Sequence, residues 1–256
     1  MSAAAPVRLL QVTDCHLKAS PDGEVKGWMT DRSLAQTLEE ALNGEPRPDA
    51  LLLTGDLAQD GSRPAYARLR KRTENLGCPV LCIPGNHDDP QVMASILSAE
   101  PFAYCGDYGF DHWRLVLLST WDGDRGGGRL SAPELERLSD TLSTRPEPHQ
   151  LVVLHHHPVP IGSAWLDGVA LDNAREFFAV LDASPRVRGV VWGHVHQLHD
   201  SQRNGVRLLG TPSSCFQFAP FLDQPALDER GPGWRWIELH PDGRIATRVQ
   251  WVGSGA

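Results

Sequence analysis

The chain has 256 residues, of which 41% are hydrophobic and 22% charged, and a formal net charge of −8. A chain of this length and composition is expected to bury a sizeable core without disulfide bonds, and its negative charge argues against general binding to DNA or RNA. No apolar stretch approaches the roughly 18 residues that span a bilayer, and residues 1–6 lack the basic and apolar parts of a signal peptide, so a soluble, cytoplasmic protein is expected.

Short apolar runs rich in Val, Leu and Ile predict buried strands. They lie at residues 7–12, 50–53, 80–83, 115–119, 151–154 and 187–192. Between them, apolar residues share one helical face over 34–42 and over 66–76, and Ser131-Ala-Pro-Glu134 resembles a capping box that begins a helix through Leu142. An antiparallel finish is predicted from strands at 206–210, 234–239 and 244–252. The alternation of strands and helices favours a layered α/β fold, with residues 1–256 as a single domain.

Residues that commonly bind metals follow five of the predicted strands. They are Asp14 and His16, then Gly55-Asp56, Gly85-Asn86-His87-Asp88, His155-His156-His157 and Gly193-His194-Val195-His196. Each motif alone is weak evidence, but their common position makes coincidence a poor explanation. In open α/β sheets, ligands bind beyond the carboxyl ends of the strands. We therefore expect five loops to bring Asp, Asn and His side chains to one end of one sheet.

Seven of these side chains are too many ligands for one metal ion but suit two. Asp56 is expected to bridge both ions, with Asp14, His16 and His196 completing one site and Asn86, His155 and His194 the other. Imidazole nitrogen together with carboxylate and amide oxygen suits iron, manganese and zinc. Two ions about 3.5–4 Å apart can hold a bridging hydroxide and bind both free oxygens of a phosphoryl group. The donor set therefore predicts phosphoester hydrolysis.

Together these motifs resemble those of the calcineurin-like metallophosphoesterases, and the resemblance extends from Leu9 to at least Pro212. Within that family, residues 155–167 and 210–218 are most similar to bacterial class III cyclic-nucleotide phosphodiesterases, in particular to the 3′,5′-cyclic-AMP subgroup. The resemblance implies a four-layer α/β/β/α sandwich and two divalent metal ions, expected to be iron or manganese with zinc as the alternative. It also implies hydrolysis of 3′,5′-cyclic AMP to 5′-AMP by a metal-bridging hydroxide.

Two other functions are considered beside this one. A glycerophosphodiesterase or a broad-specificity phosphatase could be built on the same scaffold. A binding module that kept only the fold is a different class of protein, and it would be expected to lack some of the metal ligands. None of the seven is missing from this sequence, so an enzyme is expected.

The resemblance further implies roles for individual residues. His87 is expected to contact the substrate and to protonate the leaving group, because histidine titrates near neutral pH; the alternative is that His87 only braces its loop. The residues expected to contact the substrate are His16, Asp56, Asn86, His87, His196 and Trp165. Trp165 is the best placed of three aromatic residues, with Phe216 and Phe218, that could stack on a nucleobase. Core packing is the alternative for each of the three.

Several neighbouring residues have open roles. His156 is the alternative to His155 as a ligand, because successive side chains of an extended segment point in opposite directions. Asp88 is expected to orient a ligand histidine, with a helix cap as the alternative, and Asp60 fits either role. Cys15 lies between two ligands, but a thiolate does not suit these harder donors, so Cys15 is expected to pack as a small buried residue. The sequence gives no oligomeric state.

Overall fold

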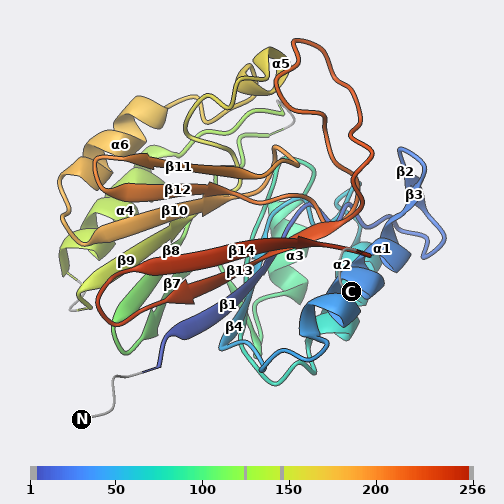
Figure 1. Ribbon diagram of the computed structural model, residues 1–256, viewed down its shortest axis with the longest axis horizontal. Helices are drawn as coiled ribbons and strands as arrows, with labels where there is room; N and C mark the ends of the chain where they lie inside the picture. Colours follow the sequence, from blue (N-terminus) through green and yellow to red (C-terminus); the bar gives the residue numbers. More distant parts are fainter. Residues whose placement is uncertain (1–4, 124–125, 145–146, 254–256) are drawn as a thin grey trace.

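The computed structural model describes residues 5–123, 126–144 and 147–253. Two six-stranded sheets pack face to face, and helices cover the outer face of each sheet (Figure 1). Of the segment considered as a signal peptide, residues 1–4 lie outside the described part of the chain. Within the described ranges, no helix is both long enough and apolar enough to cross a membrane. The cytoplasmic location stays a prediction.

The first sheet combines strands from the N-terminal half of the chain with the last two strands. Its order is β14 (Ile245–Trp251), β13 (Gly233–Leu239), β1 (Val7–Val12), β4 (Ala50–Thr54), β5 (Val80–Ile83) and β6 (Phe102–Tyr104). The strands β1, β4, β5 and β6 run parallel, whereas β13 is antiparallel to both β1 and β14. Its outer face is covered by α1 (Thr30–Leu42), α2 (Arg63–Thr73) and α3 (Pro90–Ile96); the hairpin β2 (Glu24–Val25) and β3 (Trp28–Met29) precedes α1.

The second sheet is built from the middle of the chain. Its order is β11 (His199–Arg203), β12 (Val206–Gly210), β10 (Val187–Trp192), β9 (His149–Val153), β8 (Trp113–Leu117) and β7 (Gly106–Phe110). The four central strands are parallel, and the edge strands β7 and β11 are antiparallel to their neighbours. Its outer face is covered by α4 (Ala132–Thr144), α6 (Ala174–Asp182) and the short α5 (Ala164–Asp167).

Alternating side chains bury both faces of each sheet. In β4, Leu52 points into the core between the sheets, whereas Leu51 and Leu53 pack outward against the helices. In β9, Val153 points inward and Val152 packs under the helices of the second sheet. This arrangement of helices, sheet, sheet and helices confirms the expected four-layer α/β/β/α sandwich.

The expected antiparallel finish is only partly correct. β13 and β14 do pair antiparallel in the first sheet, but β12 belongs to the second sheet and is parallel to β10. The strand β11 was not expected from the sequence, and it pairs antiparallel with β12. Its residues, His-Asp-Ser-Gln-Arg, are half-buried or exposed at an edge of the sheet. Such a strand has no apolar alternation to reveal it.

The helix expected at 131–142 is α4, but its capping box is incomplete. The Ser131 hydroxyl accepts a hydrogen bond from the Glu134 backbone N–H at 3.3 Å. The Glu134 carboxylate does not return this bond. It accepts one from the Ser119 backbone N–H at 2.9 Å and pairs with Arg137 at 2.8 Å. Glu134 therefore anchors the segment that follows β8 to the start of α4.

Candidate metal centre

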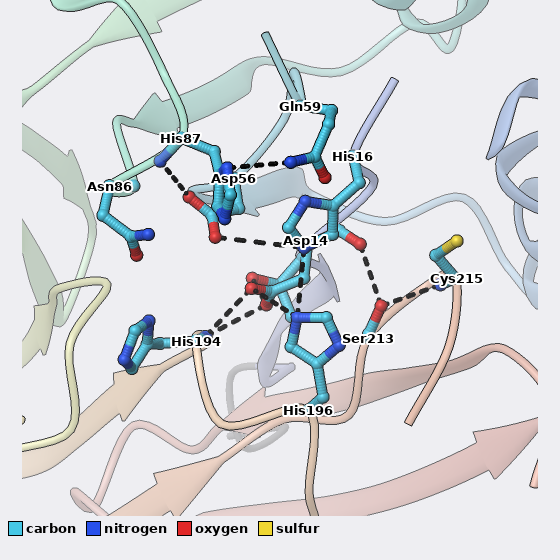
Figure 2. Close-up of polar contacts among 12 residues, drawn as sticks. Asp14, His16, Asp56, Gln59, Asn86, His87, His194, His196, Ser213 and Cys215 are labelled. Atoms are coloured by element: carbon cyan, nitrogen blue, oxygen red, sulfur yellow. Dashed lines mark hydrogen bonds and ion pairs between the residues drawn. The ribbon is translucent and has the colours of Figure 1, made fainter. Parts of the chain in front are cut away.

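The five loops predicted to carry metal ligands meet at the carboxyl ends of parallel strands. Three loops follow β1, β4 and β5 of the first sheet, and two follow β9 and β10 of the second. The expectation of one sheet is therefore wrong, because a local motif does not reveal which strands pair. Figure 2 shows the side chains of Asp14, Asp56, Asn86, His194 and His196 surrounding a common space.

One half of the cluster is formed by Asp14, His16 and His196, which offer three ligand atoms within 4.8 Å of one another. His196 Nε2 lies 3.3 Å from Asp14 Oδ1 and 3.1 Å from His16 Nε2. The other ring nitrogen of His196, Nδ1, donates to the Phe216 carbonyl at 2.7 Å. This bond fixes the tautomer and leaves the lone pair of Nε2 directed into the cluster.

The other half is formed by Asp56, Asn86, His155 and His194. His155 Nε2 lies 3.5 Å from Asp56 Oδ1 and 3.3 Å from Asn86 Oδ1. The His194 ring lies 5.1 Å from the His155 ring, and its Nε2 is buried without a hydrogen-bond partner among the described atoms. Asp56 also approaches His16 at 3.9 Å. Its carboxylate therefore touches both halves, which is the position that a shared ligand needs.

Five of the seven predicted ligands have a left-handed backbone. The angle φ is 53° at Asp14, 48° at His16, 49° at Asp56, 64° at His194 and 49° at His196. Such conformations cost a residue other than glycine about 1–3 kcal/mol each. The backbone N–H groups of Asp14 and His16 donate to the carbonyls of Gly55 and Asp56 at 3.0 and 2.9 Å. The neighbouring loop thus holds a strained backbone in place.

Two glycines allow the loops to come this close. A Cβ at Gly85 would lie 2.2 Å from Asp56 Oδ1 and 2.7 Å from His155 Nε2. A Cβ at Gly55, where φ is +97°, would lie 2.3 Å from His155 Nδ1. No side chain fits at such distances. These two glycines therefore permit the close approach of the loops.

The two buried carboxylates are stabilised in their ionised form. Burial alone would raise the pKa of Asp56, but the facing His155 outweighs it and holds that pKa well below its usual value. Burial also opposes ionisation of Asp14, yet His196 lowers its pKa. Both carboxylates therefore carry negative charge at neutral pH and can bind a cation.

Burial keeps two of the facing imidazoles neutral. It lowers the pKa of His16 to about 3 and that of His194 well below its usual value. His155 differs, because Asp56 overcomes the effect of burial and raises its pKa to about 9. Metal ligation requires neutral imidazole, so a cation binding at His155 would displace a proton.

The residues present fit divalent metal ions. Asp14 and Asp56 are fully buried, and no described lysine or arginine forms an ion pair with either. Buried carboxylates need a compensating positive charge. Protonated His155 supplies one beside Asp56, and two divalent ions would supply more to both carboxylates. The mixture of imidazole and oxygen donors suits manganese, iron and zinc.

Residues 7–198 match the sequence model of the calcineurin-like phosphoesterases. The chain belongs to this family. A protein from Vibrio vulnificus named 3′,5′-cyclic adenosine monophosphate phosphodiesterase CpdA is 39% identical over 251 residues, which cover 98% of this chain and 92% of that protein. A protein of the same name from Pseudomonas aeruginosa is 39% identical and covers 97% of this chain and 91% of its own length. A solved dimetal phosphatase from Danio rerio superimposes with a TM-score of 0.65 at 14% identity, covering 97% of this chain and 100% of its own, so it shares the fold.

The histidine run of this calcineurin-like phosphoesterase lies in a bend and not in an extended segment, so the rings of His155 and His156 lie only 4.9 Å apart. His155 faces Asp56 and Asn86, as described above. His156 Nδ1 lies 2.7 Å from Thr120 Oγ1, and its Nε2 is buried without a described partner, close to His155 and His194. This geometry supports His155 as the ligand beside Asn86 and gives His156 a contact with the segment after β8. The choice between them stays a prediction.

Asp88 has different partners from those expected. Its carboxylate accepts hydrogen bonds from the backbone N–H groups of Leu57 (3.2 Å), Ala58 (2.9 Å) and Gly85 (2.9 Å) and from the Tyr66 hydroxyl (2.9 Å). None of its described hydrogen bonds involves a histidine. Nor does it cap α3, because Asp89 does so. Asp88 instead ties the Asn86 loop to the Asp56 loop, and burial raises its pKa to about 6.

Asp88→Ala is expected to lower the free energy of unfolding of the metal-free protein by about 3–5 kcal/mol. Three buried N–H groups would lose their acceptor at about 1–3 kcal/mol each. The variant also no longer buries a carboxylate, which offsets part of this loss and keeps the total near the lower end. Tyr66→Phe removes one of these four bonds and also the acceptor of the Asp89 backbone N–H, and should cost about 1–2 kcal/mol. Urea denaturation in the presence of a chelator measures both, and equal losses would contradict the tie between the loops.

The remaining residues with open roles lie outside the ligand cluster. Asp60 accepts hydrogen bonds from the backbone N–H groups of Ala19 (3.2 Å) and Ser62 (3.3 Å), so it stabilises a turn. Cys15 is fully buried in the core under the helices of the first sheet, and burial raises the pKa of its thiol well above its usual value. A packing role for Cys15 agrees with this position.

The aromatic residues considered for nucleobase stacking contact one another and the histidines. Trp165 meets Phe218 edge-on, with ring centroids 4.7 Å apart. Phe216 is buried and packs on His196 at 4.6 Å and on His16 at 5.4 Å. These contacts favour the packing alternative, because the rings brace two predicted ligands. Stacking of Trp165 on substrate stays a prediction.

Gln59 is a residue of the site that the sequence did not reveal. Its side-chain amide lies 3.0 Å from Nδ1 of His87 (Figure 2). The His87 ring is exposed, while its backbone N–H donates to Asp56 Oδ1 at 2.8 Å. No sequence signal links Gln59 to a histidine 28 positions away, because the two meet only when the loops after β4 and β5 come together.

Proposed function

We propose that this phosphoesterase hydrolyses 3′,5′-cyclic AMP to 5′-AMP at a two-metal site. The observation that carries the proposal is the complete set of seven donors in one buried cluster, with an exposed histidine beside it. The names of the relatives that align over almost the whole chain support a cyclic nucleotide as the substrate. The buried chemistry alone does not distinguish a cyclic diester from a linear one.

The seven predicted ligands would hold the two ions with Asp56 shared between them. Asp14, His16 and His196 would complete one position, and Asn86, His155 and His194 the other. Iron or manganese is expected first, with zinc as the alternative. When bound, two such ions supply positive charge for the phosphoryl oxygens and activate a water molecule near neutral pH.

His87 is proposed to protonate the departing 3′ oxygen. Its ring is exposed at the mouth of the cluster and held edge-on against His16, with ring centroids 5.1 Å apart. The Gln59 side-chain amide is hydrogen-bonded to Nδ1 of His87. Nε2 of His87 is therefore the ring nitrogen that would carry the proton donated to the substrate. The hydrogen bond from the His87 backbone N–H to Asp56 holds the backbone of His87 next to the shared carboxylate.

A substrate panel tests the proposal. Protein reconstituted separately with manganese, iron and zinc would be assayed with cyclic AMP, cyclic GMP, a glycerophosphodiester and a simple phosphomonoester. We expect the cyclic nucleotides to have the highest kcat/KM, by roughly tenfold or more, since base stacking contributes that much. A higher kcat/KM for the glycerophosphodiester or the monoester would replace this function with the corresponding alternative.

A further inference from the structure

Two cavities adjoin the metal centre on different sides. One has a volume of about 580 Å³ and is lined by Asn86, His87, Pro90, Gln91 and Trp121 among others. The second has a volume of about 370 Å³ and is lined by His196, Phe218 and Phe221 among others. Each is large enough for part of a small ligand, so the question is which of them receives the nucleobase.

The structure assigns the nucleobase to the first cavity, with Trp121 as the side chain on which it stacks. This inference rests on the proposed function, since it names the residue that selects a nucleotide for that reaction. Trp121 is 39% exposed. Among the described residues, no ring contact or hydrogen bond involves its indole. An uncommitted aromatic face on the wall of a cavity is a stacking surface for any base.

The backbone that carries Trp121 is anchored, although the indole makes no ring contact or hydrogen bond with described residues. The hydroxyl of the preceding residue, Thr120, lies 2.7 Å from His156 Nδ1. The Thr120 carbonyl accepts a hydrogen bond from the Arg129 backbone N–H at 2.9 Å. One residue earlier, the Ser119 N–H donates to Glu134 at the start of α4. A ring presented from an anchored segment loses little conformational freedom on binding, which favours affinity.

The geometry of the reaction selects the same cavity. In a 3′,5′-cyclic nucleotide the departing oxygen stays attached to the ribose that carries the base. His87, the proposed donor to that oxygen, lines the Trp121 cavity together with Asn86. The nucleoside must therefore extend into this cavity once its phosphate lies at the metal centre.

The second cavity is less suited to this role. It reaches the centre only at His196, whose Nδ1 already donates to the Phe216 carbonyl. Its half-buried aromatic residue Phe218 already has ring partners, because it packs on Trp165 at 4.7 Å and on His196 at 4.8 Å. Phe221 is 76% exposed and is the one large free ring on that side among the described residues, which makes it the matched control.

Trp121→Ala, Trp121→Phe and Phe221→Ala would be compared on cyclic AMP and on a ribose 3′,5′-cyclic phosphate that lacks a base. Trp121→Ala should lower kcat/KM for cyclic AMP about 5- to 150-fold, mainly through KM, as loss of one stacked base does. The loss with the base-free substrate should be several-fold smaller. Trp121→Phe should recover most of the activity, and Phe221→Ala should match the wild type.

Equal losses on both substrates, no loss in Trp121→Ala, or a loss confined to Phe221→Ala would overturn the assignment. Calorimetric binding of 5′-AMP and ribose 5-phosphate separates this inference from the proposed function. If the wild type fails to hydrolyse cyclic AMP, the proposed function is wrong. The stacking role then stands only if the wild type binds 5′-AMP more tightly than ribose 5-phosphate and Trp121→Ala removes the difference.

Discussion

Asp56→Ala is expected to lower phosphodiester hydrolysis by more than about a thousandfold and to release both metal ions together. Loss of one charge-stabilising group at a reacting centre commonly costs about 100- to 1,000-fold, and Asp56 would serve two ions. Its carboxylate lies 3.5 Å from His155 and 3.9 Å from His16, which belong to different halves of the cluster. Elemental analysis of the purified variant, together with its kcat on cyclic AMP, measures both effects.

The matched variant is Asp14→Ala. Asp14 is equally buried but contacts His196 and the backbone N–H of His194, so its loss should weaken one ion more than the other. Asp242→Ala, in an exposed turn, should leave metal content and activity unchanged. Full occupancy by two metals in Asp56→Ala would show that this carboxylate is not shared.

His87→Ala is expected to lower kcat for cyclic AMP by roughly a hundredfold or more, the usual loss for a general acid. Metal content should stay close to that of the wild type, because the exposed ring contributes none of the seven predicted donors. Gln59→Ala should give a smaller loss, since it removes only the group that holds His87 Nδ1. Steady-state kinetics and elemental analysis on the three proteins check these expectations.

The chemistry of the leaving group separates proton donation from mere bracing of the loop. A nitrophenyl phosphodiester releases an oxygen that needs little protonation, so His87→Ala should retain most of its activity on that substrate. A loss as severe as that on cyclic AMP would mean that His87 positions the phosphate or the loop and does not supply a proton.

The parts of the site that could be predicted are those whose residues directly follow a predicted strand. Asp56 and His194 each follow a short apolar strand that ends at a glycine, and parallel strands bring such turns together. The partners of Asp88 were not predictable in this way. Its acceptor bonds cross from the β5 loop to backbone groups 30 and 31 positions earlier, and backbone N–H groups leave no mark on the sequence.

The same distinction applies to the fold and to the aromatic residues. The strand at 206–210 was found, but its partner was not, because apolar alternation specifies a buried face and not a neighbour. Trp165 was preferred over Phe216 and Phe218 because it lies shortly after the histidine run, and Trp121 was not considered. Distance along the chain says little about a side chain that packs across it, as Trp165 does on Phe218.

The left-handed backbone at five of the predicted ligands determines how the donor set can be re-engineered. Left-handed backbone angles occur at Asp14, His16, Asp56, His194 and His196. A β-branched or bulky replacement there loses the donor and also raises the conformational free energy of the backbone, whereas asparagine and glycine tolerate such angles. Asn86 and His155 are not among the described residues with positive φ. A library aimed at a new metal preference should therefore diversify those two positions fully and restrict the other five to Asp, Asn, His and Gly.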